Sequence, residues 1–80
     1  MSSYDHYLEA KKIADKIEAE GFTVEAAAAR RVIDEGKSGT EIFMQLRFYL
    51  APLQESEEID PVTRDHITTL IAKINEALTR

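Results

Sequence analysis

Two histidines stand beside carboxylates in this sequence, a pairing that metal binding and general base catalysis both use. His6 follows Asp5, and His66 follows Asp65. Adjacent residues on a helix point in different directions, so neither aspartate can orient the imidazole next to it. No second metal-ligating residue lies four positions from either histidine. We interpret both histidines as boundary residues at the edge of an apolar face, and we expect no metal and no cofactor.

A phosphate-binding loop is the second chemistry that the residue types suggest, because Gly36, Lys37 and Ser38 match the end of that motif. The motif also needs a glycine five positions before Gly36, where this chain has Arg31, and a preceding strand. We interpret the segment as a polar turn between helices. No serine, histidine and acid are spaced as a nucleophile with a positioned base, so we predict that the protein is not an enzyme.

Nucleic acid binding is the third possibility, since a helix-turn-helix could form around residues 23–53. The basic residues in that region are Arg30, Arg31, Lys37 and Arg47. A recognition helix needs polar or basic side chains near its start, and here Glu41 is followed by Ile42 and Phe43. The formal net charge of −5 also repels phosphates, so we expect no nucleic acid partner.

Length and composition describe one small domain over residues 1–80, with 44% hydrophobic and 31% charged residues. The chain contains no cysteine, which excludes disulfides and thiol catalysis and fits a reducing compartment. No apolar run approaches the roughly 18 residues that suggest a membrane span. We therefore expect a cytoplasmic protein without a membrane partner.

Apolar residues recur at helical spacing throughout the chain, and no segment alternates like a strand. Four helices are predicted: from about Tyr4 to Glu20, from Thr23 to just before Gly36, from Thr40 to near Pro52, and from Asp60 to the C-terminus. Thr23, Thr40 and Asp60 are the expected N-caps, and Pro61 suits the first position of the last helix. Gly21 suits the left-handed position after the first helix. Pro52 either ends or bends the third helix, and residues 54–59 form the linker after it.

The expected inward faces follow from the same spacing. Their members are Ala10, Ile13, Ala14 and Ile17, then Ala28, Ala29, Val32 and Ile33, then Ile42, Leu46, Tyr49, Leu50 and Leu53, and finally Ile67, Leu70, Ile71, Ile74 and Leu78. Short connections favour antiparallel neighbours, so we predict an all-α fold: a compact antiparallel four-helix bundle with the third helix central. An open three-helix core with a loosely docked first helix is the alternative.

The third helix carries more large apolar residues than one face needs. Phe43, Met44 and Phe48 lie off its main stripe. They form either a second, partner-binding face, for which aromatic residues and methionine are typical, or the interior of a helix that is touched on several sides. The acidic residues Glu55, Glu57 and Glu58 follow this helix. They form either a solvated loop or a landing site for a basic partner.

The stretch Ser38-Gly39-Thr40-Glu41-Ile42 in a short acidic chain resembles the colicin-type DNase immunity proteins. Those proteins have four helices and neutralise a basic nuclease with acidic and aromatic residues. In that family the stretch leads at once into a Tyr-Tyr-Pro signature in a very short helix, whereas Phe43-Met44-Gln45 continues a long one here. The resemblance therefore transfers no binding residue. The chain also resembles many small uncharacterised bacterial helical proteins, a similarity that implies no function.

We predict that the protein is a protein–protein interaction module or a self-associating protein. In the second case it would form a homodimer. Its candidate partner-binding residues are Phe43, Met44, Phe48, Glu55, Glu57 and Glu58. The alternative is a toxin-neutralising immunity protein that binds a basic nuclease.

Overall fold

Four α-helices and one short 3-10 helix follow one another along the chain, with no strand among residues 4–79. The computed structural model describes these residues. The helices are α1 (His6–Ala19), α2 (Thr23–Glu35), α3 (Gly39–Leu50), the 3-10 helix η1 (Ala51–Glu55) and α4 (Pro61–Leu78). The all-α prediction is confirmed. None of these helices combines the length and the apolar character needed to cross a membrane.

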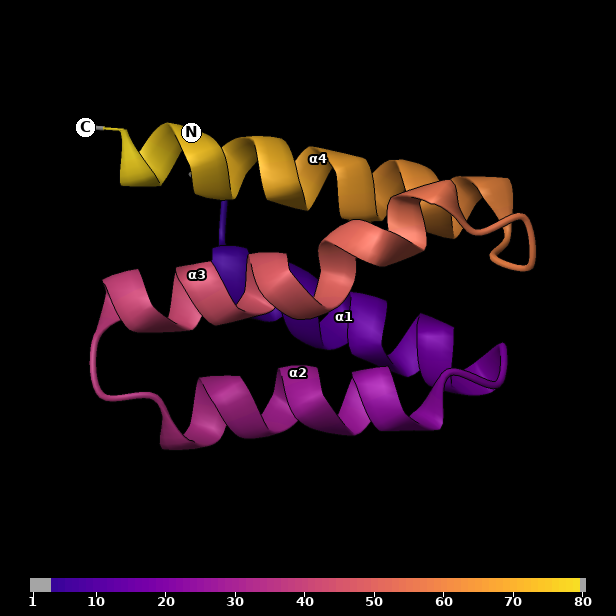
Figure 1. Ribbon diagram of the computed structural model, residues 1–80, viewed down its shortest axis with the longest axis horizontal. Coiled ribbons are helices and arrows are strands. Elements are labelled where there is room, and N and C mark those ends of the chain that lie inside the picture. Colours follow the sequence, from indigo (N-terminus) through magenta and orange to yellow (C-terminus); the bar gives the residue numbers. More distant parts are fainter. Residues whose placement is uncertain (1–3, 80) are drawn as a thin grey trace.

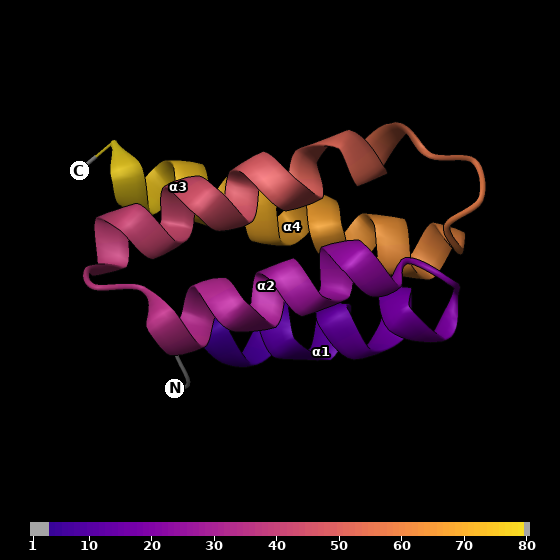
Figure 2. The same cartoon turned by 60° about the horizontal axis from the view of Figure 1, so that its bottom comes forward.

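Each helix runs antiparallel to the one before it, in an up-down-up-down bundle (Figure 1). Helix α1 packs against α2 and α4, α3 contacts both α2 and α4, and η1 packs on α4 (Figure 2). The predicted antiparallel four-helix bundle is therefore confirmed. The alternative with a loosely docked first helix is wrong, because α1 buries a full face between two neighbours.

The core consists of one apolar face from every helix, at the spacing that the 3.6-residue period requires. Its members are Ala10, Ile13, Ala14, Ile17, Ala26, Ala29, Val32, Ile42, Leu46, Leu50, Leu53, Ile59, Ile67, Leu70, Ile71 and Ile74. The three expected members Ile33, Tyr49 and Leu78 are only partly buried at its margin. Alanines on α2 keep that helix thin, which allows α1 to approach it closely.

Helix starts are fixed by side chains that accept a hydrogen bond from the first turn. Asp5 accepts from the Leu8 N–H at 3.1 Å, and Asp60 accepts from the Val62 N–H at 3.1 Å, as predicted for the last helix. The prediction of Thr40 as the third N-cap is wrong, because the Ser38 hydroxyl accepts from the Glu41 N–H at 3.2 Å and the helix begins at Gly39. The prediction of Thr23 is wrong by one residue.

Thr23 is itself helical, and the cap position belongs to Phe22, whose side chain accepts no hydrogen bond. The preceding turn explains why none is needed. Gly21 has a φ of +102°, the Gly21 N–H donates to the Glu18 carbonyl and the Phe22 N–H donates to the Ile17 carbonyl. This pair of hydrogen bonds is a Schellman motif, and it confirms the expected role of Gly21. Phe22 then packs against the core.

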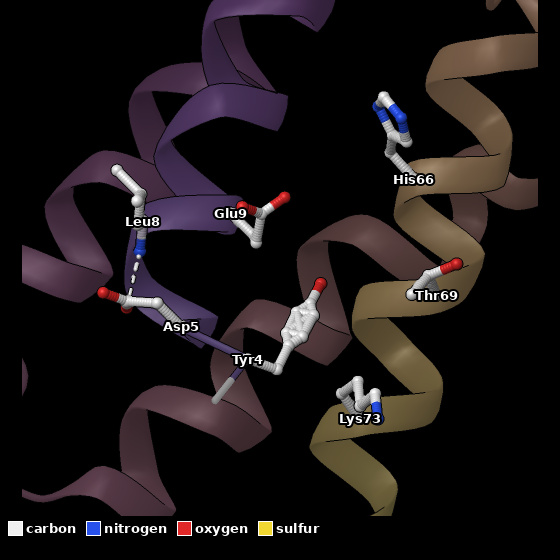
Figure 3. Close-up of a pocket in the computed structure, with 7 residues that line it drawn as sticks. All are labelled: Tyr4, Asp5, Leu8, Glu9, His66, Thr69 and Lys73. Atoms are coloured by element: carbon white, nitrogen blue, oxygen red, sulfur yellow. Dashed lines mark hydrogen bonds between the residues drawn. The ribbon is translucent and has the colours of Figure 1, made fainter. Parts of the chain in front are cut away.

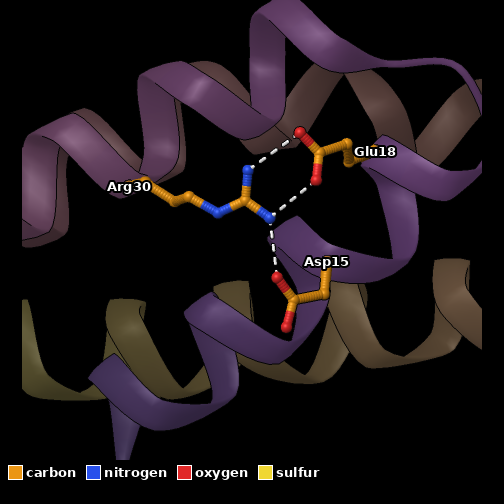
Figure 4. Close-up of polar contacts among 3 residues, drawn as sticks. All are labelled: Asp15, Glu18 and Arg30. Carbon is orange, nitrogen blue, oxygen red and sulfur yellow. Dashed lines mark hydrogen bonds and ion pairs between the residues drawn. The ribbon is translucent and has the colours of Figure 1, made fainter.

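Arg30 on α2 joins the first two helices on their outer surface (Figure 4). Its guanidinium donates to both carboxylate oxygens of Glu18, at 3.1 and 3.2 Å, and to Asp15 at 2.6 Å. These two hydrogen-bonded carboxylates raise the pKa of Arg30. The group is exposed, so it favours the α1–α2 orientation more than it adds stability.

Pro52 marks the point where α-helical hydrogen bonding gives way to a tighter helix. Helix α3 ends at Leu50, and η1 includes Pro52 near its start. Proline lacks the N–H that would continue the α-helical ladder, so the chain tightens instead of stopping. Residues 54–55, expected in the linker, therefore belong to η1, and Ile59 from that linker is buried in the core.

Candidate functional site

The structure divides the three off-stripe residues of α3 between two environments. Met44 is 51% exposed and Phe48 is 73% exposed, whereas Phe43 is partly buried against the core. Residues 44 and 48 are four apart and share one helix face, while Phe43 lies toward α1. The three residues thus differ: Met44 and Phe48 face solvent, and Phe43 packs against the core.

Phe43 belongs to an aromatic cluster at the end of the bundle where α1 begins. Its ring centroid lies 4.8 Å from that of His6 and 5.8 Å from that of Tyr7. The His6 ring also lies 5.2 Å from the Tyr4 ring, and His6 Nε2 lies 3.4 Å from the Lys73 carbonyl oxygen. These contacts hold α1, α3 and α4 together, so Phe43 has a packing role here.

Met44 and Phe48 continue into η1 as an apolar strip, which we call the α3 strip: Met44, Phe48, Ala51 and Pro52. The strip lines an open groove of about 710 Å³, together with Arg47, Gln54 and Glu55. The Phe48 ring meets the Tyr49 ring edge to face, with centroids 5.3 Å apart. Most of the Phe48 side chain nevertheless stays in solvent.

The α3 strip is exposed because it lies on the side of α3 that faces away from the core. Ile42, Leu46 and Leu50 point into the core, and among residues 4–79 no other α-helix covers the face of α3 that carries Met44 and Phe48. Single exposed apolar residues, such as Val24 at 76% exposure, are ordinary on protein surfaces. Adjacent exposed methionine and phenylalanine side chains beside a groove are typical of an interface.

Carboxylates flank the α3 strip at both of its ends. Glu41, exposed at the start of α3, accepts from the Gln45 amide at 3.2 Å. Glu55 lines the groove at the other end, and Glu57 and Glu58 are exposed just beyond it. Two basic groups lie nearby. Arg47 donates to the Asn75 side-chain oxygen on α4 at 2.7 Å, and Arg64 donates to the Ser56 carbonyl oxygen at 3.1 Å. The edge of the strip is therefore predominantly acidic.

The comparisons with known proteins give no relatives. No family model matches the chain, and no curated protein or solved structure matches it either. The resemblance to DNase immunity proteins stays a prediction from residues 38–42. In the structure, Ser38 caps α3, and α3 extends for 12 residues.

A second concave region lies between the start of α1 and the middle of α4 (Figure 3). We call it the α1–α4 cleft. It has a volume of about 610 Å³ and is lined by Tyr4, Asp5, Leu8 and Glu9 on one side and by His66, Thr69 and Lys73 on the other. The acidic groups come from the α1 side, and the basic groups come from α4.

Of the two histidines, His6 is partly buried in the aromatic cluster and His66 is exposed in the α1–α4 cleft. Within the part of the chain that the structure describes, no three histidine or acidic side chains are grouped to hold a metal ion. The Asp5 carboxylate caps α1 by accepting a hydrogen bond from the Leu8 N–H, so it does not orient His6.

The sequence interpretation did not select the residues of the cleft. His66, Thr69 and Lys73 are spaced three and four apart, so they share a face of α4, and Asp5 and Glu9 share a face of α1. That spacing was visible in the sequence. Whether these two helix faces lie opposite each other depends on how α4 packs beside α1, and that packing could not be read from the spacing.

Proposed function

We propose that the protein is a non-enzymatic helical binding module, acting in the cytoplasm, whose docking surface is the α3 strip. The supporting observation is the exposure of Phe48 and Met44 side by side on a helix whose opposite face fills the core. Burying one such side chain in an interface would contribute about 1.5–3 kcal/mol. Two anchors on a rigid helix form a typical centre for an interface.

The charges at the ends of the strip favour a partner of a different kind over a second copy. A symmetric antiparallel contact centred on Phe48 would place Glu41 of one copy opposite Glu55 of the other. A parallel contact would place each glutamate opposite its own counterpart. Both arrangements bring like charges together between two chains that each carry −5.

A register centred on Ala51 would instead bring Arg47 toward the other copy's Glu55. It would also place Met44 opposite Glu58 and Phe48 opposite Gln54, which buries apolar side chains against polar ones. The Arg47 guanidinium is already held by Asn75. We therefore assign the strip to a partner segment that has apolar anchors and Lys or Arg at its ends, with a homodimer as the competing outcome.

A toxin-neutralising immunity protein is a special case of this proposal, favoured by the acidic edge of the strip and by the resemblance of residues 38–42. Its partner would be a basic nuclease. Tight 1:1 binding to a nuclease encoded beside this protein would support that case. Undiminished nuclease activity in the presence of excess protein would exclude it for that nuclease.

The test uses two designed amphipathic helical peptides that have the same leucine face, flanked by lysine in one and by glutamine in the other. Calorimetric titration should give tighter binding of the lysine peptide, and the difference should shrink at high salt. Phe48→Gln, which leaves the net charge unchanged, should weaken binding about tenfold or more. Val24→Gln, at an equally exposed apolar residue on α2, should leave it unchanged.

Equal binding to wild type and Phe48→Gln would overturn the docking surface. Equal binding of the two peptides would overturn the charge of the partner while leaving the surface intact. Light scattering over a concentration series covers the remaining outcome. A dimer that Phe48→Gln dissociates would replace the foreign partner with a second copy of this chain.

A further inference from the structure

The α1–α4 cleft separates opposite charges onto opposite walls. Glu9 lies on the α1 side, and His66 and Lys73 lie on the α4 side (Figure 3). The carboxylate of Asp5 is engaged with the Leu8 N–H, so Glu9 is the acid left to face the cleft. A ligand between these walls would meet the Glu9 carboxylate on one side, and the Lys73 ammonium and the His66 imidazole on the other.

The two walls do not neutralise each other. Glu9 pairs with Lys12 at 3.4 Å, and Lys73 lies 4.0 Å from Glu76, so each charge pairs within its own helix. Among residues 4–79, no ion pair and no hydrogen bond joins the side chains of one wall to those of the other. Exposed ion pairs three residues apart on one helix are weak, so the charged groups of a ligand can replace these partners at little cost in free energy.

The aromatic ring of Tyr4 forms part of the lining of the cleft. The His6 ring lies 5.2 Å from it, and Lys73 Nζ lies 5.7 Å from its centroid, within range of a cation–π contact. Burial, aided by the negative charge of Glu9, raises the pKa of the Tyr4 phenol above its usual 10.0. At neutral pH its hydroxyl is protonated, as in any tyrosine, and can donate a hydrogen bond. Leu8, about half exposed, adds an apolar contact at the rim.

We propose that the α1–α4 cleft binds small zwitterions of the α-amino-acid class that carry an apolar or aromatic side chain. The ammonium group faces Glu9, and the carboxylate faces Lys73 and His66. The side chain of the ligand lies against Tyr4 and Leu8. The cleft volume of about 610 Å³ lies within the range of about 300–1,000 Å³ that is usual for small-molecule sites. This inference is independent of the docking surface on α3.

The test compares three probes that share a phenyl ring: L-phenylalanine, phenethylamine, which has only the ammonium group, and 3-phenylpropionate, which has only the carboxylate. Amide NMR titrations of the full chain should localise the shifts of L-phenylalanine to the cleft residues. We expect a Kd on the order of 1 mM for L-phenylalanine, because the site is open. Each of the other probes should bind at least about tenfold more weakly, since it loses one charge contact.

The chain offers a charge-matched control for each wall. Glu9→Gln should abolish the preference over 3-phenylpropionate, whereas Glu76→Gln, which removes the same charge outside the cleft, should keep it. Lys73→Gln should abolish the preference over phenethylamine, and Lys12→Gln should keep it. The proposal fails if the three probes bind equally, if the shifts lie outside the cleft, or if the control variants lose as much affinity as Glu9→Gln and Lys73→Gln.

Discussion

The carboxylate of Glu20, just after α1, accepts a hydrogen bond from the buried hydroxyl of Thr63 in the first turn of α4, with Oε2 2.9 Å from Oγ1. The other oxygen of Glu20 accepts from the Asp60 N–H at 2.6 Å. In a capping box, the third residue of a helix supplies the acid that receives the N–H of its own N-cap. Here Thr63 occupies that third position, and the acid is the C-cap residue of α1, 40 positions before Asp60.

Glu20→Ala should destabilise the fold by about 1–3 kcal/mol, because it leaves the Thr63 hydroxyl and the Asp60 N–H without their partner and removes a negative charge from the positive end of α4. Glu20→Gln keeps an acceptor and should lose less. Urea unfolding followed by circular dichroism measures both. Glu57→Ala, at an exposed glutamate, is the control and should change little. Equal stabilities for Glu20→Ala and Glu57→Ala would contradict the capping role.

Gly36 and Gly39 lie three residues apart in the α2–α3 connection and should respond to alanine in opposite directions. A Cβ on Gly36 would lie 2.6 Å from the Val32 carbonyl oxygen and would overlap the Ile42 side chain. Gly36→Ala should therefore cost about 1–3 kcal/mol. At Gly39, the first residue of α3, a Cβ would meet only the Tyr7 hydroxyl at 3.5 Å. Gly39→Ala should therefore stabilise by up to about 1 kcal/mol.

Thermal unfolding of the two glycine variants checks the opposite signs. A double-mutant cycle with Ile42→Ala isolates the steric cause, since truncating Ile42 should cost less free energy beside Ala at position 36 than beside Gly. Additive effects of the two substitutions would show that the cost at Gly36 comes from another source.

Phe48→Glu should change the free energy of unfolding by no more than about 0.5 kcal/mol, because the ring is mostly in solvent. Leu46→Ala, at a fully buried position on the same helix, should cost about 2–5 kcal/mol. Urea unfolding of both variants distinguishes surface from core. A loss of folding in Phe48→Glu would place Phe48 in the core and would remove the basis of the proposed docking surface.

Much of the fold was predictable because apolar residues recur at the 3.6-residue spacing of a helix face in all four helices. The spacing of Ala10, Ile13, Ala14 and Ile17 defines a helix face whatever lies beside it. Gly21 and the Asp60-Pro61 pair mark helix ends through their own stereochemistry. Four such helices with short connections have few ways to bury their apolar faces, and an antiparallel bundle is one of them.

The N-cap of α3 could not be chosen from the sequence, because Ser38 and Thr40 both offer a hydroxyl. The structure selects Ser38 because its backbone is extended, with φ −147° and ψ 155°, as a cap requires. The buried Ile59 was missed because it sits among acidic residues and has no periodic neighbour. Likewise, the placement of Phe43 and Phe48 needed the position of α1, which covers one and leaves the other exposed.

Ile59→Ala should destabilise the protein by about 2–4 kcal/mol, since Ile59 is 1% exposed and anchors the acidic turn to the core. Val62→Ala, three residues later at a 56% exposed valine, removes less buried volume and should change stability by no more than about 0.5 kcal/mol. Chemical denaturation of the two variants makes the comparison. Similar values for both would mean that the acidic turn is not anchored by this side chain.

Tyr4 should make the protein less stable at alkaline pH. Its folded-state pKa is raised above the usual 10.0 by burial and by the charge of Glu9. Below that usual value the phenol is protonated in both states, and its contribution to stability is fully present. As pH rises above it, the unfolded chain loses the proton first, so unfolding becomes more favourable until the folded-state pKa is passed.

Tyr4→Phe removes this titration and leaves the other tyrosines in place, so the comparison isolates one phenol. The urea midpoints of wild type and variant should differ by a constant amount up to about pH 9. Above about pH 10 the midpoint of the wild type should fall relative to that of the variant. The difference should grow from about pH 10 upward until the folded-state pKa is passed, because Tyr4 is protonated in both states below about pH 9. Midpoints that stay parallel across the whole range would mean that the Tyr4 hydroxyl is as solvated in the folded protein as in the unfolded chain.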